Sequence, residues 1–135
     1  MFPNELHQDA FRARNGEFGW TRDQIPAVVD VLRSHGMGIL GGELWWVRDG
    51  LTDWEGLIPQ RHGPPGVYMW QTKREPGEPS QNFIERGVSD ALAAAKRWPM
   101  PDDLPLDLSG RILYNLTWIS EGEFKKLTAR SSQGE

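Results

Sequence analysis

The stretch GILGGELWWV, residues 38–47, decides the fold of this chain. It reads as a β-strand, and successive side chains of a strand point to opposite faces of a sheet. Trp45 and Trp46 are therefore expected on opposite faces. Gly41 and Gly42 indicate a β-bulge or a close backbone approach just before Glu43. We predict a central strand entered through a glycine bulge, in which the role of Glu43 depends on which face is dry.

Helix and strand signals extend outward from this stretch in both directions. Upstream, Thr21 can cap a helix whose apolar side chains recur at helical spacing over residues 25–32, and Gly36 stands where such a helix would end. Downstream, Asp49-Gly50 predicts a hairpin turn. The other expected elements are a weak strand within 51–60, a strand over 66–73, a long helix from Ser80, a strand over 111–119 and a short helix over 121–129.

The order of these elements predicts a single α+β domain over residues 1–130. We expect a small, mostly antiparallel sheet of three to four strands, with two long helices packed on one face and a short C-terminal helix. Residues 1–20 carry no clear period and are expected to form an irregular arm or lid. Residues 131–135 are expected to be a flexible tail.

Alternation divides the expected strands into two faces. The predicted core face is uniformly apolar or aromatic and comprises Leu44, Trp46, Tyr68, Trp70, Ile112, Tyr114, Leu116 and Trp118. The other face is mixed and comprises Glu43, Trp45, Val47, Val67, Met69, Gln71, Leu113, Asn115, Thr117 and Ile119. This mixed face is either an ordinary half-solvated surface or a recognition surface. In the second case Trp45 and Met69 are adaptable contacts, ringed by the polar groups of Glu43, Gln71, Asn115 and Thr117.

Composition limits the classes of function. Fifteen basic and nineteen acidic residues give a formal charge of −4. This balance argues against sequence-independent nucleic-acid binding and is compatible with a basic protein partner. No apolar run approaches membrane-spanning length, and the polar start of the chain is not expected to act as a secretory signal. Cysteine is absent, which excludes disulfides and thiolate chemistry and fits a reducing cytoplasm.

No catalytic constellation is recognisable in the sequence. Glu43 could share acid–base chemistry with Asp53, Glu55 or His62, but their spacing does not require contact. The three histidines are far apart and form no metal-ligand pattern, and no serine lies in a GxSxG motif. We therefore predict a protein that is not an enzyme and that holds no metal or cofactor.

A proline-rich acidic loop precedes the last strand. Asp102, Asp103 and Asp107 alternate with apolar residues, and prolines at 99, 101 and 105 stiffen the segment. A preorganised loop of this kind suits docking on a basic protein surface at small ordering cost. It is equally compatible with a solvated connection from helix to strand.

The overall organisation resembles that of small bacterial immunity proteins of polymorphic toxin systems. The resemblance covers roughly residues 20–125 and lies in AVVDVLRSHGMGILGGELWWV, GVYMWQT, NFIERG and GRILYNLTWISEGEF. It implies a cytoplasmic protein that binds a cognate toxin and blocks it, and it defines no functional residue. The predicted contacts with a basic toxin surface are Glu43, Trp45, Met69, Gln71, Asp102, Asp103, Asp107 and Asn115.

Two other functions remain as hypotheses. The first is a small-ligand module, such as a carbohydrate-binding protein, that uses exposed tryptophans as stacking platforms. The second is a hydrolase in which Glu43 is the acid or base.

Overall fold

The structure of the protein, a computed structural model, describes residue 6 and residues 10–97, 104 and 111–133, with side chains up to residue 129. Its main body is a six-stranded sheet in the order β1-β2-β8-β3-β4, with β7 also paired to β3. The strands are β1 (Phe11–Arg12), β2 (Phe18–Trp20), β3 (Gly38–Arg48), β4 (Leu51–Glu55), β7 (Met69–Gln71) and β8 (Arg111–Ile119). All of these pairs are antiparallel. A separate two-stranded sheet joins β5 (Leu57–Ile58) to β6 (Gly66–Val67).

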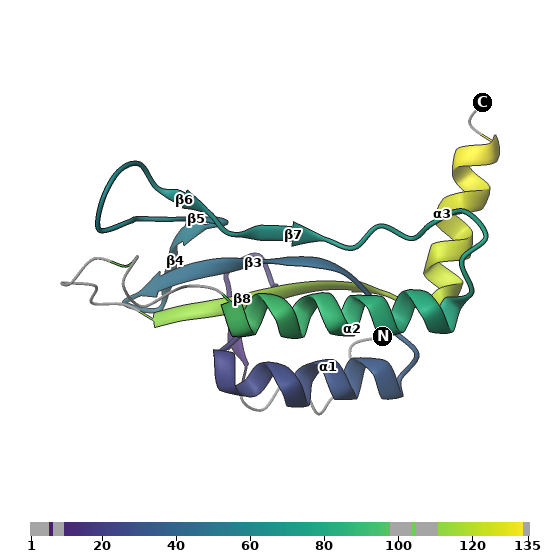
Figure 1. The fold of residues 1–135 in the computed structure, drawn as a ribbon, viewed down its shortest axis with the longest axis horizontal. Coiled ribbons are helices and arrows are strands. Elements are labelled where there is room, and N and C mark those ends of the chain that lie inside the picture. Colours follow the sequence, from purple (N-terminus) through teal and green to yellow (C-terminus); the bar gives the residue numbers. More distant parts are fainter. Residues whose placement is uncertain (1–5, 7–9, 98–103, 105–110, 134–135) are drawn as a thin grey trace.

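The described helices lie outside this sheet. A short 3₁₀ turn (Arg22–Gln24) leads into α1 (Ile25–Ser34), and the other helices are α2 (Ser80–Arg97) and α3 (Glu121–Gln133). Helices α1 and α2 pack against each other on one side of β3 and β8, whereas α3 stands at one end of the molecule and points away from it (Figure 1).

The prediction of a three- to four-stranded sheet with two long helices is wrong. In the described residues the main sheet has six strands and a second small sheet is present, and of the described helices only α2, with 18 residues, is long. Helix α1 has 10 residues, and the C-terminal helix α3, expected to be short, has 13. The strands of the main sheet that were not expected are β1 and β2, two and three residues long, in the segment predicted to be an irregular arm. They carry too few residues for a period, so they form through pairing with each other and with β8 rather than through local preference.

The signals of the central hairpin are confirmed. Strand β3 turns directly into β4, with Arg48 opposite Leu51. Asp49 and Gly50 take φ angles of 53° and 76°, as a tight hairpin turn with two left-handed central residues requires. The end of α1 is also as expected, because Gly36 has φ 71° and the Met37 N–H donates to the Leu32 carbonyl.

The predicted core face is the core of the protein. Leu44, Trp46, Tyr68, Tyr114 and Leu116 are buried together with the apolar side chains of α1 and α2. Trp70, Ile112 and Trp118 are partly buried and pack against the same cluster. The opposite face of the sheet, which we call the open face, carries the mixed set of side chains.

A three-way backbone junction places β7 beside β4 along one edge of β3. The Leu44 carbonyl accepts from Gly56, the Leu44 N–H donates to the Tyr68 carbonyl, and the Tyr68 N–H donates to the Gly56 carbonyl, at 2.7–3.0 Å. Along this edge β3 therefore changes partners at Leu44: the residues before Leu44 pair with β7, and the residues after it pair with β4. This junction brings Met69 next to Glu43, the residue with which it is paired.

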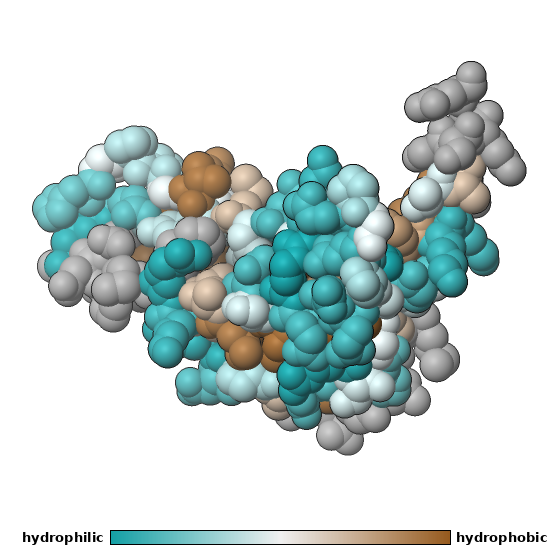
Figure 2. All heavy atoms as spheres, turned by 45° about the vertical axis from the view of Figure 1, so that its right-hand side comes forward, coloured by the Kyte–Doolittle hydropathy of each residue, from teal (hydrophilic) through white to brown (hydrophobic). Residues whose placement is uncertain are grey.

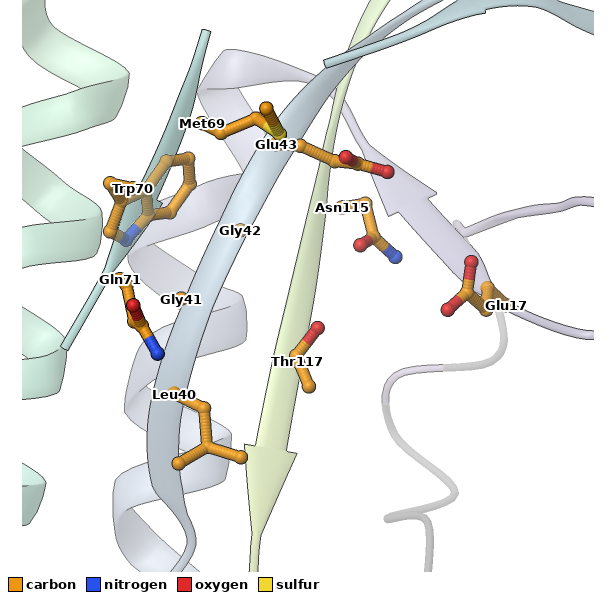
Figure 3. Close-up of a pocket in the computed structure, with 10 residues that line it drawn as sticks. All are labelled: Glu17, Leu40, Gly41, Gly42, Glu43, Met69, Trp70, Gln71, Asn115 and Thr117. Carbon is orange, nitrogen blue, oxygen red and sulfur yellow. The ribbon is translucent and has the colours of Figure 1, made fainter. Parts of the chain in front are cut away.

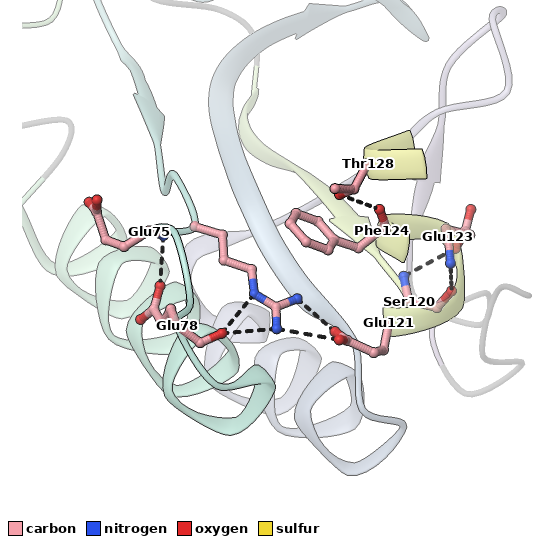
Figure 4. A network of polar contacts seen from close by, with 8 residues as sticks. Glu75, Glu78, Ser120, Glu121, Glu123, Phe124 and Thr128 are labelled. Carbon is pink, nitrogen blue, oxygen red and sulfur yellow. Dashed lines mark hydrogen bonds and ion pairs between the residues drawn. The ribbon is translucent and has the colours of Figure 1, made fainter. Parts of the chain in front are cut away.

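Arg74 anchors the start of α3 (Figure 4). Its guanidinium forms a 2.7 Å ion pair with Glu121, donates to the Glu78 carbonyl and lies 4.4 Å from the ring centroid of Phe124. The hydrogen bond from Arg74 holds the pKa of Glu121 below its ordinary value. Ser120 and Glu123 add a reciprocal capping box. The base of α3 is therefore fixed by charge and capping.

Candidate functional site

A hollow of about 520 Å³ lies on the open face of the sheet. We call it the groove. Strand β7 forms one wall, β3 and β8 form the floor, and Glu17, from the turn between β1 and β2, lies on the far side (Figure 3). Its lining residues are Glu17, Leu40, Gly41, Gly42, Glu43, Met69, Trp70, Gln71, Asn115 and Thr117.

Two glycines make the hollow possible. The β3–β8 register shifts between Ile39 and Gly41, and Gly41 has φ 153°, so the predicted glycine bulge is confirmed. A Cβ atom at Gly41 would collide with the Trp70 carbonyl oxygen, and one at Gly42 would collide with the Asn115 carbonyl and the Trp70 ring. The floor is therefore bare backbone because no side chain fits between β7, β3 and β8.

Glu43 is held in place by Trp45, its neighbour on the same face of β3. The indole N–H of Trp45 donates to Glu43 Oε1 at 2.9 Å. The second carboxylate oxygen, Oε2, and the sulfur of Met69 both lie close above Gly56, about 3 Å from where a Cβ atom would be. The carboxylate thus has one oxygen committed to the fold and lies beside the thioether of Met69.

Asn115 lies on the groove floor between Glu43 and Glu17 (Figure 3). It is buried, and its Nδ2 donates to the Phe18 carbonyl of β2 at 2.9 Å. This hydrogen bond fixes the amide and connects the floor to the hairpin that carries Glu17. A second hollow of about 250 Å³ adjoins the groove and shares Glu17, Asn115 and Thr117 with it.

An exposed apolar ridge borders the groove. Leu57 of β5 is paired with Val67 of β6, and Met69 follows two residues later on the same side of the chain. Val67 is 61% and Met69 51% exposed, and Leu57 is exposed as well. Figure 2 shows hydrophobic surface at this end of the molecule, around the β5–β6 hairpin. The apolar ridge and the groove meet at Met69.

Trp45 is not part of this surface, contrary to the prediction. Its side chain is 0% exposed and belongs to a second buried cluster with Ala13, Val47 and Leu113. Phe11 of β1 covers it edge-on, with ring centroids 6.4 Å apart. The N-terminal hairpin therefore covers the indole, which leaves Trp45 unable to contact a partner or stack against a sugar.

The other predicted contacts divide into two groups. Glu43, Met69, Gln71 and Asn115 come from three separate strands and are brought together in the groove. Asp102, Asp103 and Asp107 lie outside the described residues.

Glu17 is the main groove residue that the sequence prediction missed. It follows a tight turn in which the Gly16 N–H donates to the Ala13 carbonyl and the Ala13 N–H donates to the Glu17 carbonyl. The dipeptide Asn15-Gly16 is a strong hairpin signal, and it lies between the apolar positions of β1 and β2. That signal could have predicted the hairpin, although not its position over β8.

The ionisable side chains that line the groove are Glu17 and Glu43. Across the described residues, no cluster of three or more His, Asp or Glu side chains could hold a metal ion. None of the described helices has the length and hydropathy of a membrane-spanning segment. The arrangement can offer carboxylate and amide acceptors beside an apolar wall.

Comparisons with known proteins give no family for the chain. No protein-family model, no curated protein and no solved structure matches it.

Proposed function

We propose that this protein is a toxin-neutralising immunity protein, acting in the cytoplasm by binding a cognate bacterial toxin and occluding its active site. The observation that carries the proposal is the groove itself. Four residues that the sequence marks as contacts (Glu43, Met69, Gln71 and Asn115) line one exposed hollow, and an apolar ridge borders it. A stoichiometric inhibitor needs shape, apolar area and charge on one preformed surface, and this face supplies all three.

The surface also has the composition expected of an interface centre. Exposed apolar side chains that lie together are typical of protein-binding sites, and methionine adapts to the shape of a partner. The carboxylates of Glu17 and Glu43 favour a partner with a basic surface. A typical stable interface buries about 1,600 Å² in total, so the groove and apolar ridge would form its centre rather than its whole extent.

Co-expression with any toxin that is encoded beside this protein tests the proposal. We expect growth to be rescued and the two purified proteins to form a one-to-one complex. Replacing Val67 by Ser and Met69 by Ala together should weaken the complex at least tenfold, because both side chains are exposed and would be buried on binding. The matched control is Leu127→Ser on α3, an equally exposed apolar residue away from the groove. Failure of the unaltered protein to bind or neutralise that toxin would contradict the proposal.

A further inference from the structure

We infer that the groove receives an arginine or lysine side chain of the protein partner, and that the apolar ridge of Leu57, Val67 and Met69 receives an apolar neighbour of that side chain. This inference rests on the proposed function and names the chemistry of the partner. It is carried by charge, by the shape of the hollow and by the position of the ridge.

The charge argument comes from the groove lining. Glu17 and Glu43 contribute carboxylates, and no Lys, Arg or His is among the ten lining residues. Glu43 is partly buried and oriented by Trp45, so it is positioned before any partner arrives. A carboxylate already fixed and partly withdrawn from water attracts a cation more strongly than a freely solvated one. The same charges would repel an anionic ligand.

The shape argument comes from the distribution of polar groups along the groove. Met69 offers an apolar wall on one side of Glu43, and the amide of Asn115 and the carboxylate of Glu17 lie on its other side (Figure 3). Arginine and lysine have the same division, with an apolar stem and a charged tip. The volume of about 520 Å³ lies within the range of ligand pockets. An extended basic side chain can therefore lay its stem against Met69 and direct its donors toward the carboxylates of Glu43 and Glu17.

The apolar ridge explains why the partner is a protein rather than a free cation. Met69 lines the groove and also belongs to the ridge, and its sulfur lies beside Glu43 Oε2 above Gly56. A basic side chain in the groove would place its neighbouring residue over Leu57 and Val67, which are exposed. Arginine surrounded by apolar contacts is a common arrangement at the energetic centre of protein interfaces.

The first experiment uses capped tripeptides and the isotope-labelled full chain. Leu-Arg-Leu is titrated against Leu-citrulline-Leu, which has nearly the same shape without the charge, while NMR follows the amides of Gly41, Gly42, Gln71 and Asn115. We expect saturable, salt-sensitive shifts with the arginine peptide and at least tenfold weaker binding of the citrulline peptide. Equal binding of the two peptides, or no saturable shift up to about 10 mM, would overturn the inference.

Variants of the chain test whether the groove residues bind the arginine peptide. The double substitution Glu17→Gln and Glu43→Gln removes both charges and keeps an acceptor for the Trp45 indole, and it should weaken the arginine peptide at least tenfold. Thr117→Lys, at an exposed position on the groove floor, should compete for the same carboxylates and also prevent binding. Glu75→Gln, an exposed charge outside the groove, is the control and should change nothing. Unaltered peptide binding by folded Thr117→Lys protein would count against the inference even if the double variant failed to fold.

Measurements of toxin binding distinguish a failure of this inference from a failure of the proposed function. If the toxin binds the double variant Glu17→Gln and Glu43→Gln as tightly as the unaltered protein, no basic side chain of the toxin lies in the groove, although the immunity function stands. If the peptides behave as expected but the toxin is neither bound nor neutralised, the groove binds a basic protein side chain and the proposed function is wrong.

Discussion

The two halves of the open face of the sheet differ in what covers them. In the half that contains Trp45, Val47 and Leu113, side chains pack into a dry cluster beneath Phe11 and Ala13. In the half that contains Glu43 and Thr117, the same two strands line an open groove. Both halves belong to β3 and β8 and have the same alternation along the chain.

The N-terminal hairpin accounts for the difference. Strand β2 pairs with β8 at Tyr114 and Asn115, and β1 pairs with β2 alone among the described strands. Gly19 leaves room for the Trp45 ring, because a Cβ atom there would lie 3.0 Å from a ring carbon. The hairpin can therefore cover Trp45, while its turn places Glu17 at the side of the groove. A mixed sheet face becomes either core or open groove according to what packs over it.

Trp45→Ala should give the largest loss of stability, because it empties the dry half of the face. Removing a fully buried indole costs about 3–5 kcal/mol in the free energy of unfolding. Met69→Ala, in the groove half, should change it by no more than about 0.5 kcal/mol. Urea unfolding of the two variants measures the difference. Equal losses would show that the two halves are not distinct.

Gly41→Ala should be the next most damaging change, because it breaks the floor of the groove. The φ angle of 153° and the collision with the Trp70 carbonyl oppose any side chain, and backbone strain of this kind costs about 1–3 kcal/mol. The comparison is Gly122→Ala in α3, where the space is open and the helix should tolerate the change. Thermal unfolding would measure the loss of stability, and NMR shifts of Trp70 and Gln71 would show the local change in structure. A fully stable Gly41→Ala protein would contradict the assigned bulge.

Glu43→Leu tests the link between the two halves. It leaves the buried indole N–H of Trp45 without its acceptor, which costs about 1–3 kcal/mol. Glu43→Gln keeps an oxygen at that position and should lose less than half as much. Chemical denaturation distinguishes the two, and near-equal stabilities would mean that the hydrogen bond contributes little.

Val67→Ser should have the smallest effect on folding. The side chain is 61% exposed, so the free energy of unfolding should change by no more than about 0.5 kcal/mol. Affinity for the partner should nonetheless fall, since the apolar area of the ridge is reduced. A large loss of stability would show instead that this ridge belongs to the core.

Local patterns predicted the long elements and much of the groove. The apolar repeat before Gly36 and the 111–119 strand carry enough residues to show a period, and both are confirmed. The Asp49-Gly50 turn, which was predicted from its residue types, is confirmed as well. Alternation also placed Glu43, Met69, Gln71 and Asn115 on one face, and they line one hollow. Strands β1 and β2 were not assigned and β5 only weakly, because two or three residues show no period. The single strand predicted over 66–73 is divided into β6 and β7, which belong to different sheets.

The sequence by itself determined which side chains share a face, because the two-residue period of a strand is a local property. It also determined the bulge, since Gly41 and Gly42 are adjacent in the chain. Only the tertiary structure decided which part of that face is dry. The cover over Trp45 comes from Phe11 and Ala13, more than thirty residues away in the sequence. Which residues come to lie over a strand depends on long-range pairing and packing, which no local pattern of side chains encodes.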